Sequence, residues 1–254
     1  MLHTIEKAGQ VLALFNRDHP EWGVREVADT LGVAKSSARD LLTSLSQVGL
    51  LGRTDAGRYR LGWRLVSLSE TLLATTELLR EARSTVEELA AQYQETIHLA
   101  ILDDTKVVYV DKLEGRQAVR VELTTLGTRL YAHCSALGKV LLAYRPEADV
   151  KRIVKTEGLP RFTNNTITDP VELEQALTKI RRQGYAYDLE EILPDLCCVG
   201  APIRNHTGQV MAAVSMSIPA YRFHRSQVEF RKAVVRAANV VSERLGYYAE
   251  VCAA

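Results

Sequence analysis

Serine side chains in the second half of the chain have the spacing of an anion-binding site. Ser135 stands directly before an apolar helical run that begins with Ala136 and Leu137. A serine N-cap leaves backbone N–H groups at the helix start, where the helix dipole favours an anion. Ser215 and Ser217 are two residues apart in a β-type segment, so both hydroxyls point to one face. The pattern predicts a pocket for a small anion. The alternative is that Ser135 only caps its helix and the strand serines satisfy local hydrogen bonds.

Adjacent cysteines in another β-type segment allow two further interpretations. In an enzyme, Cys198 would be the nucleophile, with His133 or His98 as base and Asp188 orienting it. A metal-binding domain using Cys198 would draw on four soft ligands: His133, Cys134, Cys197 and Cys198. The sequence contains neither a catalytic-cysteine signature nor paired zinc spacing. We therefore predict no catalytic residue, no cofactor and no metal site.

Residues 24–61 carry a second pattern, two short helices followed by a β-hairpin. Apolar residues recur at helical spacing in both helices: Val24, Val27, Ala28 and Leu31 in the first, and Ala38, Leu41, Leu42 and Leu45 in the second. Gly32 lies between the helices, where a tight turn favours glycine. Strands at 50–53 and 58–61 flank a polar turn. This order is typical of a winged helix-turn-helix, which places its second helix in the major groove of DNA.

Two polar surfaces of this segment carry the side chains expected to meet DNA. They lie on the second helix and on one face of the hairpin: Lys35, Ser36, Arg39, Thr43, Arg58 and Arg60. Residues 1–65 contain nine basic and seven acidic residues, so the placement of the cations favours DNA more than their number does. The alternative is a small helical domain with a solvated basic face, or one that contacts proteins.

Composition excludes several other classes. The chain has 254 residues and a net charge of +1, so its surface as a whole is not that of a polyanion binder. No apolar run approaches the roughly 20 residues of a membrane span. Glu6, Gly9 and Gln10 interrupt any signal peptide, and four cysteines do not make a disulfide framework. We expect a reduced, cytoplasmic protein of two domains with no membrane partner.

The elements that must position these residues follow from periodicity. Neither glycine nor proline occurs from 63 to 114, and residues 65–90 read as a long helix that is weakest at Thr75 and Thr76. Strands are predicted at 96–102, 107–113, 119–123, 185–189, 197–203 and 210–218, and helices at 170–183 and 226–248. Asp169 caps the helix that starts at Pro170, and Gly184 ends it. The fold class is α+β, with a mostly antiparallel sheet.

The sequence resembles the IclR-type transcriptional regulators over essentially its whole length. In the first domain the matching residues are Val27, Ala28, Leu31, Gly32, Val33, Lys35, Ser36, Ser37, Leu41, Leu42, Gly57, Arg58, Tyr59, Leu61 and Gly62. In the second domain they are His133, Ser135, Ala136, Gly138, Lys139, Gly184, Tyr185, Asp188, Glu190, Glu191, Cys198, Val199, Ala201, Pro202, Ile203 and Gly208. Their order and spacing together are specific.

The resemblance implies an organisation and a function. Residues 1–62 would form the winged helix-turn-helix, with Ser37 joining the DNA-binding set. Residues 63–84 would form a linker helix, and residues 85–254 a GAF-like domain for effector binding and oligomerisation. The expected protein is a transcriptional regulator that binds a near-palindromic DNA operator and is controlled by a small effector. The family also implies homodimers, commonly associating as dimers of dimers.

The resemblance further implies which residues hold the effector. Relatives that bind small organic acids use the backbone amides that correspond to Ala136 and Leu137. Their side-chain contacts correspond to Asp188, Cys198, Ser215 and Ser217. These positions coincide with the anion site predicted from capping and alternation. Two departures stand out. Asp195 replaces a usual glycine, and Asp40 replaces a common arginine in the second helix, where it would pair with a nearby cation or read a cytosine amine.

Overall fold

A computed structural model of the protein describes residues 3–116 and 124–248. The chain divides into two compact units, Met1–Thr76 and Glu77–Ala254. Each unit is built around its own core.

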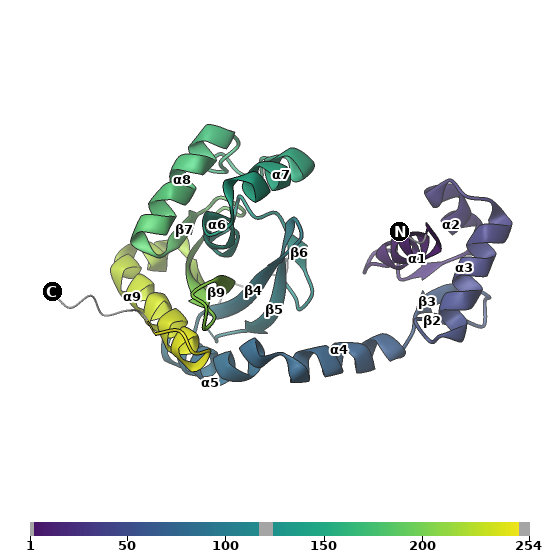
Figure 1. The fold of residues 1–254 in the computed structure, drawn as a ribbon, viewed down its shortest axis with the longest axis horizontal. Coiled ribbons are helices and arrows are strands. Elements are labelled where there is room, and N and C mark those ends of the chain that lie inside the picture. Colours follow the sequence, from purple (N-terminus) through teal and green to yellow (C-terminus); the bar gives the residue numbers. More distant parts are fainter. Residues whose placement is uncertain (1–2, 117–123, 249–254) are drawn as a thin grey trace. The chain divides into compact units, whose positions relative to one another are not determined.

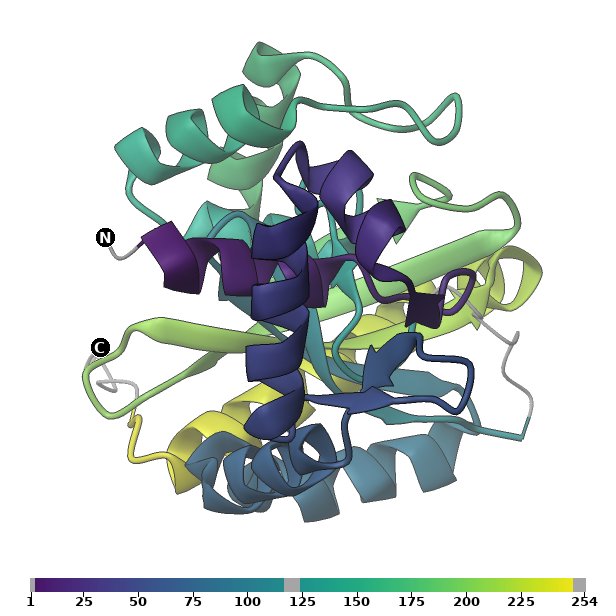
Figure 2. The same cartoon turned by 90° about the vertical axis from the view of Figure 1, so that its right-hand side faces the viewer.

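The first unit is a winged helix-turn-helix. Its elements are α1 (His3–Ala13), β1 (Glu21–Trp22), α2 (Val24–Leu31), α3 (Lys35–Gln47), β2 (Leu51–Arg53), β3 (Tyr59–Leu61) and α4 (Arg64–Thr75). Figure 2 shows the first three helices together with the hairpin. The predicted helix pair and hairpin are therefore confirmed. The two-residue strand β1, which pairs with β3 through Trp22 and Tyr59, was not predicted because it is too short to show alternation.

The core of this unit comes from the apolar faces of the helices. The buried residues are Val11, Val27, Ala28, Ala38, Leu41, Leu42, Leu45, Leu51 and Tyr59. Gly32 ends α2 in the left-handed conformation, with φ of 62°, which a residue with a side chain rarely adopts. The turn at Gly32 sets the direction of α3, whose polar face stays exposed.

The predicted long helix is two helices, α4 and α5 (Glu77–Tyr93). Thr76 between them has extended dihedrals, φ −82° and ψ 108°. The hydroxyls of Thr75 and Thr76 donate to the carbonyls of Thr71 and Leu72, four residues back, a bonding pattern that often bends helices. The helix thus ends at the position predicted to be weakest. The predicted linker, residues 63–84, contains α4 and the first part of α5.

The second unit is a six-stranded sheet between two helical layers. The strands are β4 (Thr96–Asp103), β5 (Lys106–Leu113), β6 (Arg129–Leu130), β7 (Ala186–Leu189), β8 (Leu196–Arg204) and β9 (Val210–Pro219). Their order is β6-β5-β4-β9-β8-β7, and every pairing is antiparallel. The predicted antiparallel sheet is confirmed.

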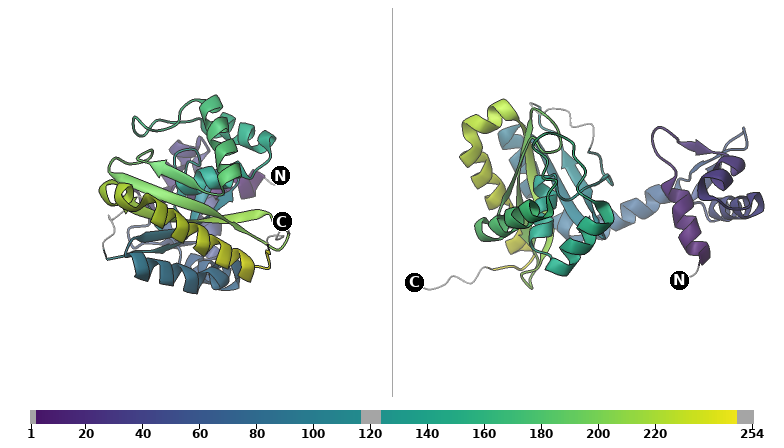
Figure 3. Two further views of the ribbon diagram at one scale, coloured as in Figure 1. Left: turned by 90° about the vertical axis from the view of Figure 1, so that its left-hand side faces the viewer. Right: turned by 90° about the horizontal axis from the view of Figure 1, so that it is seen from above.

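Helices cover both faces of this sheet, as Figures 1 and 3 show. On one face, α5 and α9 (Ala220–Arg244) enclose a core with side chains from β4, β8 and β9. On the other face lie α6 (Ala136–Ala143), α7 (Glu147–Glu157) and α8 (Pro170–Gln183). Asp169 caps α8 and Gly184 ends it, as predicted. Each residue of a central strand therefore faces one of two different environments.

Some elements differ from the prediction. The short strand β6 and helix α7 were not predicted, and α9 begins six residues earlier than expected, with a kink at Ser226. The predicted strand at 119–123 lies outside the described residues. Within the described ranges, no helix combines the length and apolarity needed to cross a membrane.

Candidate nucleic-acid interface and anion site

The outer face of α3 is exposed and polar. The predicted residues on it, all exposed, are Lys35, Ser36, Ser37, Arg39 and Thr43. The inner face is buried in the core of the unit, so the helix cannot rotate without exposing leucines. Asp40 is also exposed and forms no ion pair with any described residue. The arrangement presents one basic and hydroxyl-rich helical face to solvent.

The two hairpin arginines differ in their surroundings. Arg58 donates to both carboxylate oxygens of Glu26, at 3.1 and 2.7 Å, and to the backbone carbonyl of Glu21 at 2.9 Å. Glu26 in turn accepts from the amide of Gly23 at the start of α2. Arg58 therefore ties the hairpin to α2, a role that alternation along the strand did not predict. Arg60 is exposed on β3.

The start of α6 has the capped geometry expected of an anion site. Ser135 is extended, with φ −132° and ψ 154°, and its hydroxyl accepts from the amide of Gly138 at 3.1 Å. The amides of Ala136 and Leu137 are among the first four of the helix, which lack partners within it. A Cβ at Gly138 would lie 2.2 Å from the carbonyl oxygen of Ala132. Only glycine therefore allows this close packing beneath the helix start.

Strand register brings the predicted side chains to the same place. Asp188 on β7 pairs with Cys198 on β8, and Cys198 pairs with Ser217 on β9. In the adjacent row, Ser215 on β9 pairs with His98 on β4. Partners across antiparallel strands point to the same face, so these side chains form two neighbouring rows. Cys198 packs with Ala136 and Leu196 on this face, whereas its neighbour Cys197 lies in the core on the opposite face of the sheet.

These residues surround one small cavity of about 20 Å³, room for about one water molecule. All six predicted residues line it: Ala136, Leu137, Asp188, Cys198, Ser215 and Ser217. Ser135, predicted as the cap of the helix, lines it too, whereas the sequence prediction of the effector pocket missed the rest of the lining: His98, Tyr109, Thr124, Leu130, Ile192, Leu193 and Leu196. The sequence signal that could have placed His98 in the lining is the alternation within 96–102, which puts its side chain on the opposite face of the strand from Ile97.

His98 is buried and neutral. Its Nε2 lies 2.8 Å from the Thr124 hydroxyl, and its Nδ1 lies 3.4 Å from the Ser217 hydroxyl. Burial, and then the positive charge of Lys112, lower the pKa of His98 to about 3. A neutral imidazole has one donor and one acceptor nitrogen, so it connects Thr124 to Ser217 and orients that hydroxyl.

Asp188 lies in a network of buried charges. Its Oδ1 accepts from the Glu191 amide at 2.8 Å, while Oδ2 is buried without a hydrogen-bond partner among the described residues. Burial, and then the charge of Glu191, raise the pKa of Asp188 to about 7. Lys139 on α6 forms a buried ion pair with Glu191. A ligand hydroxyl in the cavity would give Oδ2 a partner.

The cysteine geometry disfavours a nucleophile. The Cys198 thiol lies 3.2 Å from the Ser217 hydroxyl, and burial followed by the Asp188 charge raises the pKa of this thiol well above its usual range. A reactive cysteine needs a lowered pKa. His133, the other proposed base, lies 3.0 Å through Nε2 from the carbonyl oxygen of Pro160. The structure thus gives no support to the enzyme alternative.

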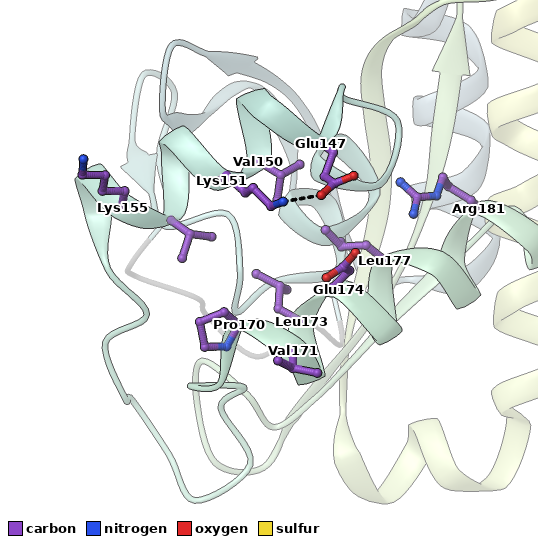
Figure 4. Close-up of a pocket in the computed structure, with 11 residues that line it drawn as sticks. Glu147, Val150, Lys151, Lys155, Pro170, Val171, Leu173, Glu174, Leu177 and Arg181 are labelled. Carbon is purple, nitrogen blue, oxygen red and sulfur yellow. Dashed lines mark ion pairs between the residues drawn. The ribbon is translucent and has the colours of Figure 1, made fainter.

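A larger groove of about 310 Å³ lies between α7 and α8, shown in Figure 4. Val150, Leu173 and Leu177 form part of its apolar floor, and the ion pair of Lys151 with Glu147 stands at its edge. It contains none of the predicted site residues. We assign the candidate anion site to the smaller cavity, because the start of α6 and the hydroxyls of Ser215 and Ser217 converge on it.

The chain matches two family models. One, described as bacterial transcriptional regulator IclR C-terminal, matches residues 70–243, and the IclR helix-turn-helix domain matches residues 4–55. The chain is 33% identical over 249 residues to the HTH-type transcriptional regulator XynR of Escherichia coli (strain K12), covering 97% of this chain and 98% of XynR.

Two solved structures are similar over nearly the whole chain. The IclR protein of Thermotoga maritima has a TM-score of 0.73 at 31% identity, covering 97% of this chain and 100% of that one. An IclR homologue from Microbacterium hydrocarbonoxydans, solved in complex with 4-hydroxybenzoate, has a TM-score of 0.81 at 26% identity and covers 95% and 98% of the two chains.

Proposed function

Because the chain belongs to the IclR family of bacterial transcriptional regulators, we propose that a small organic acid bound at the start of α6 controls its binding to a near-palindromic operator. The helix-turn-helix domain and the effector-binding domain are both present. The proposal concerns the residues that make each contact and the chemical class of the effector.

The proposed DNA contacts come from α3 and the wing. Lys35, Ser36, Ser37, Arg39 and Thr43 would enter the major groove, and Arg60 would contact phosphates. Arg58 was predicted as a contact too, but its bonds to Glu26 and Glu21 support a positioning role instead. Arg39 is the residue best suited to read a base, since arginine bonds guanine bidentately.

The proposed effector is a carboxylic acid with a hydroxyl group. Its carboxylate would accept from the amides of Ala136 and Leu137, where the helix dipole favours an anion. Ser215 and Ser217 would donate hydrogen bonds, and Oδ2 of Asp188 would accept from the ligand hydroxyl. Cys198 would form part of the wall. The observation that carries this proposal is the convergence of all six residues on one cavity. The 4-hydroxybenzoate complex of the relative fits the same chemical class.

Binding an organic acid requires the cavity to expand. A cavity of about 20 Å³ does not hold a molecule the size of a benzoate. Ile192 and Leu193, between β7 and β8, line the cavity and are only partly buried. We propose that this segment moves on binding, which is the step that would communicate the effector's presence to the rest of the domain.

We also propose that the protein acts as a homodimer, with a dimer of dimers as its larger assembly. Within α4, all of whose residues the structure describes, no side chain is buried. Leu68 and Leu72 are 50% and 66% exposed, and with Leu65 they follow the i, i+3, i+7 spacing of a helix interface. A two-fold dimer would bind half-sites about 34–36 Å apart or a multiple of that distance.

We propose no catalytic activity, since the family acts through DNA and the Cys198 thiol is held protonated. Because a bacterial transcriptional regulator must reach the chromosome, we propose that the protein acts in the cytoplasm.

Two assays on the purified full chain test the proposed function. Selection from a random duplex library, followed by sequencing of the bound DNA, should yield a two-fold symmetric motif. Thermal denaturation in the presence of hydroxy acids, including 4-hydroxybenzoate, should show stabilisation that the matching amides do not produce, because a ligand of the folded state raises its apparent stability. An asymmetric motif, or equal stabilisation by acids and amides, would contradict the proposal.

A further inference from the structure

Three side chains of different chemistry meet on the side of the sheet opposite the effector cavity. Glu190, Cys197 and His224 each have a potential metal-ligand atom within 4.8 Å of those of the other two. A carboxylate, a thiol and an imidazole together form a set that borderline-soft metal ions prefer. The three residues have no part in the DNA interface or in the lining of the effector cavity.

Each ligand comes from a different structural element. Glu190 directly follows β7 and has a φ of 60°, Cys197 is the second residue of β8, and His224 lies in the first turns of α9. Hydrogen bonds hold these parts together: the amide of Glu190 donates to the carbonyl of Leu196, and the amide of Ala220 donates to the carbonyl of Asp195. The backbone therefore fixes the spacing of the three side chains.

The three residues differ in burial, so that an ion could reach them from solvent. Cys197 is fully buried, Glu190 is half-buried and His224 is exposed. The thiol thus lies at the base of the group, with the carboxylate and the imidazole on its solvent side. The Glu190 carboxylate accepts from the amide of Asp195 through Oε2 at 2.9 Å. This bond orients the carboxylate, as outer hydrogen bonds do for metal ligands generally, and a carboxylate has lone pairs for both partners.

Although the sequence predicted no metal site, the geometry points to a Zn²⁺ site formed by Glu190, Cys197 and His224, and we propose that this protein binds one such ion per chain. Zn–S bonds of about 2.3 Å and Zn–N or Zn–O bonds of about 2.0–2.2 Å in a tetrahedral site place the ligand atoms about 3.3–3.7 Å apart. The ligand atoms, which now lie within 4.8 Å of one another, would therefore approach by about 1.5 Å at most on ion binding. The exposed imidazole of His224 has room to make part of this movement by side-chain rotation. With three protein ligands, the fourth position is left to water.

A bound ion would cross-link the effector-site segment. Glu190 and Cys197 flank residues 191–196, three of which (Ile192, Leu193 and Leu196) line the effector cavity. The ion would join both ends of this segment to α9 and stabilise the folded domain by binding that state preferentially. Any effect on effector affinity rests on the proposed function, whereas ion binding itself does not.

Metal titration of the untagged full chain tests the site. Calorimetry with Zn²⁺ should give one ion per chain for the wild type. Co²⁺, which occupies the same kind of site, should show a thiolate-to-metal charge-transfer band. His224→Ala changes only an exposed side chain, so its folding is not at risk, and it should weaken Zn²⁺ binding at least tenfold. Cys197→Ala should abolish the charge-transfer band.

Matched variants control for adventitious binding. His206→Ala removes an exposed histidine from the β8–β9 turn, and Cys134→Ala removes another buried thiol. Both should retain wild-type Zn²⁺ affinity and the Co²⁺ band. Failure of the wild type to bind Zn²⁺, equal affinity in His224→Ala, or loss of the band in Cys134→Ala instead of Cys197→Ala would overturn the proposal. None of these results depends on the effector, so they leave the proposed function to its own assays.

Discussion

The hydroxyl oxygen of Ser135 accepts a hydrogen bond from the backbone amide of Gly138, at 3.1 Å. This bond satisfies one amide of the first turn of α6 and leaves those of Ala136 and Leu137 at the cavity wall. The absence of a side chain at Gly138 lets the helix start pack on Ala132. The same cap that stabilises the helix therefore prepares its end to bind an anion.

Replacing Arg39 by Ala should relax the sequence preference of DNA binding. An arginine that reads a base edge contributes roughly 1–3 kcal/mol of discrimination, so affinity for the selected operator should fall about 5- to 150-fold while binding to unrelated DNA changes little. Fluorescence anisotropy with both duplexes measures the ratio. If the variant binds both duplexes with unchanged affinity, Arg39 makes no base contact, and the assignment of α3 as the recognition helix is wrong.

The two wing arginines should respond differently to alanine. Arg60→Ala should weaken binding to all sequences alike and reduce the slope of log K against log salt by about 0.9, as loss of one phosphate contact does. Arg182→Ala, on α8 of the other unit, serves as the charge-matched control. A steeper or unchanged salt slope in Arg60→Ala would show that this residue makes no phosphate contact.

Arg58→Ala should instead act through the stability of the first unit. The variant loses the ion pair with Glu26, which belongs to a partly exposed network and contributes modestly to the stability of the unit. A lower unfolding temperature of this unit with a nearly unchanged salt slope is expected. If the salt slope falls as in Arg60→Ala, then Arg58 leaves Glu26 to bind phosphate.

Charged substitutions on α4 should dissociate the proposed dimer. Leu68→Glu combined with Leu72→Glu places two carboxylates on the exposed apolar stripe, where burying them against a partner would be costly. Light scattering after size exclusion should report a monomer. Ser67→Glu with Ser69→Glu adds the same charge to exposed serines of the same helix and should leave the mass unchanged. Equal masses for all three proteins would place the interface elsewhere.

His98 should make the second unit sensitive to acid. Its pKa is about 3 in the folded state and 6.5 in the unfolded state, so between these values the unfolded chain binds the extra proton. Stability should therefore fall as the pH falls from 6.5 towards 3, by about 1.4 kcal/mol per pH unit from this group. Urea unfolding at pH 7 and pH 5 measures the change. His98→Gln should lose less stability between the two pH values than the wild type does, and His206→Gln should lose the same amount. An identical loss in His98→Gln would mean that His98 is protonated in the fold.

Much of the effector site could be predicted from the sequence because its geometry depends on residues that are close together in the chain. The cap at Ser135 and the shared face of Ser215 and Ser217 depend on residues at most three apart. The weak point at Thr75 and Thr76 is also local, since each hydroxyl bonds within its own helix.

The parts that sequence did not predict depend on distant partners. Arg58 and Glu26 are 32 residues apart, and His98 and Ser217 are 119 apart, so no periodicity relates them. Strand alternation predicted the face of the hairpin on which Arg58 lies, but it did not predict that the Glu26 carboxylate binds this side chain. The small volume of the cavity likewise results from side chains of β4, β5 and the β7–β8 segment that meet only in the folded domain.

The most direct test of the effector site is calorimetric titration of the best organic acid from the thermal screen into the wild type and into the double variant Ser215→Ala, Ser217→Ala. Each hydrogen bond to the carboxylate is worth about 1.5–3 kcal/mol, so the double variant should bind at least 100-fold more weakly. Ser242→Ala, a buried serine of α9 that bonds to Arg204 and Ala238, should bind the acid with wild-type affinity. Operator binding without effector should be the same in all three proteins, since coupling is a separate free energy. Equal affinity of the acid for the wild type and the double variant would contradict the account and place the effector outside this cavity.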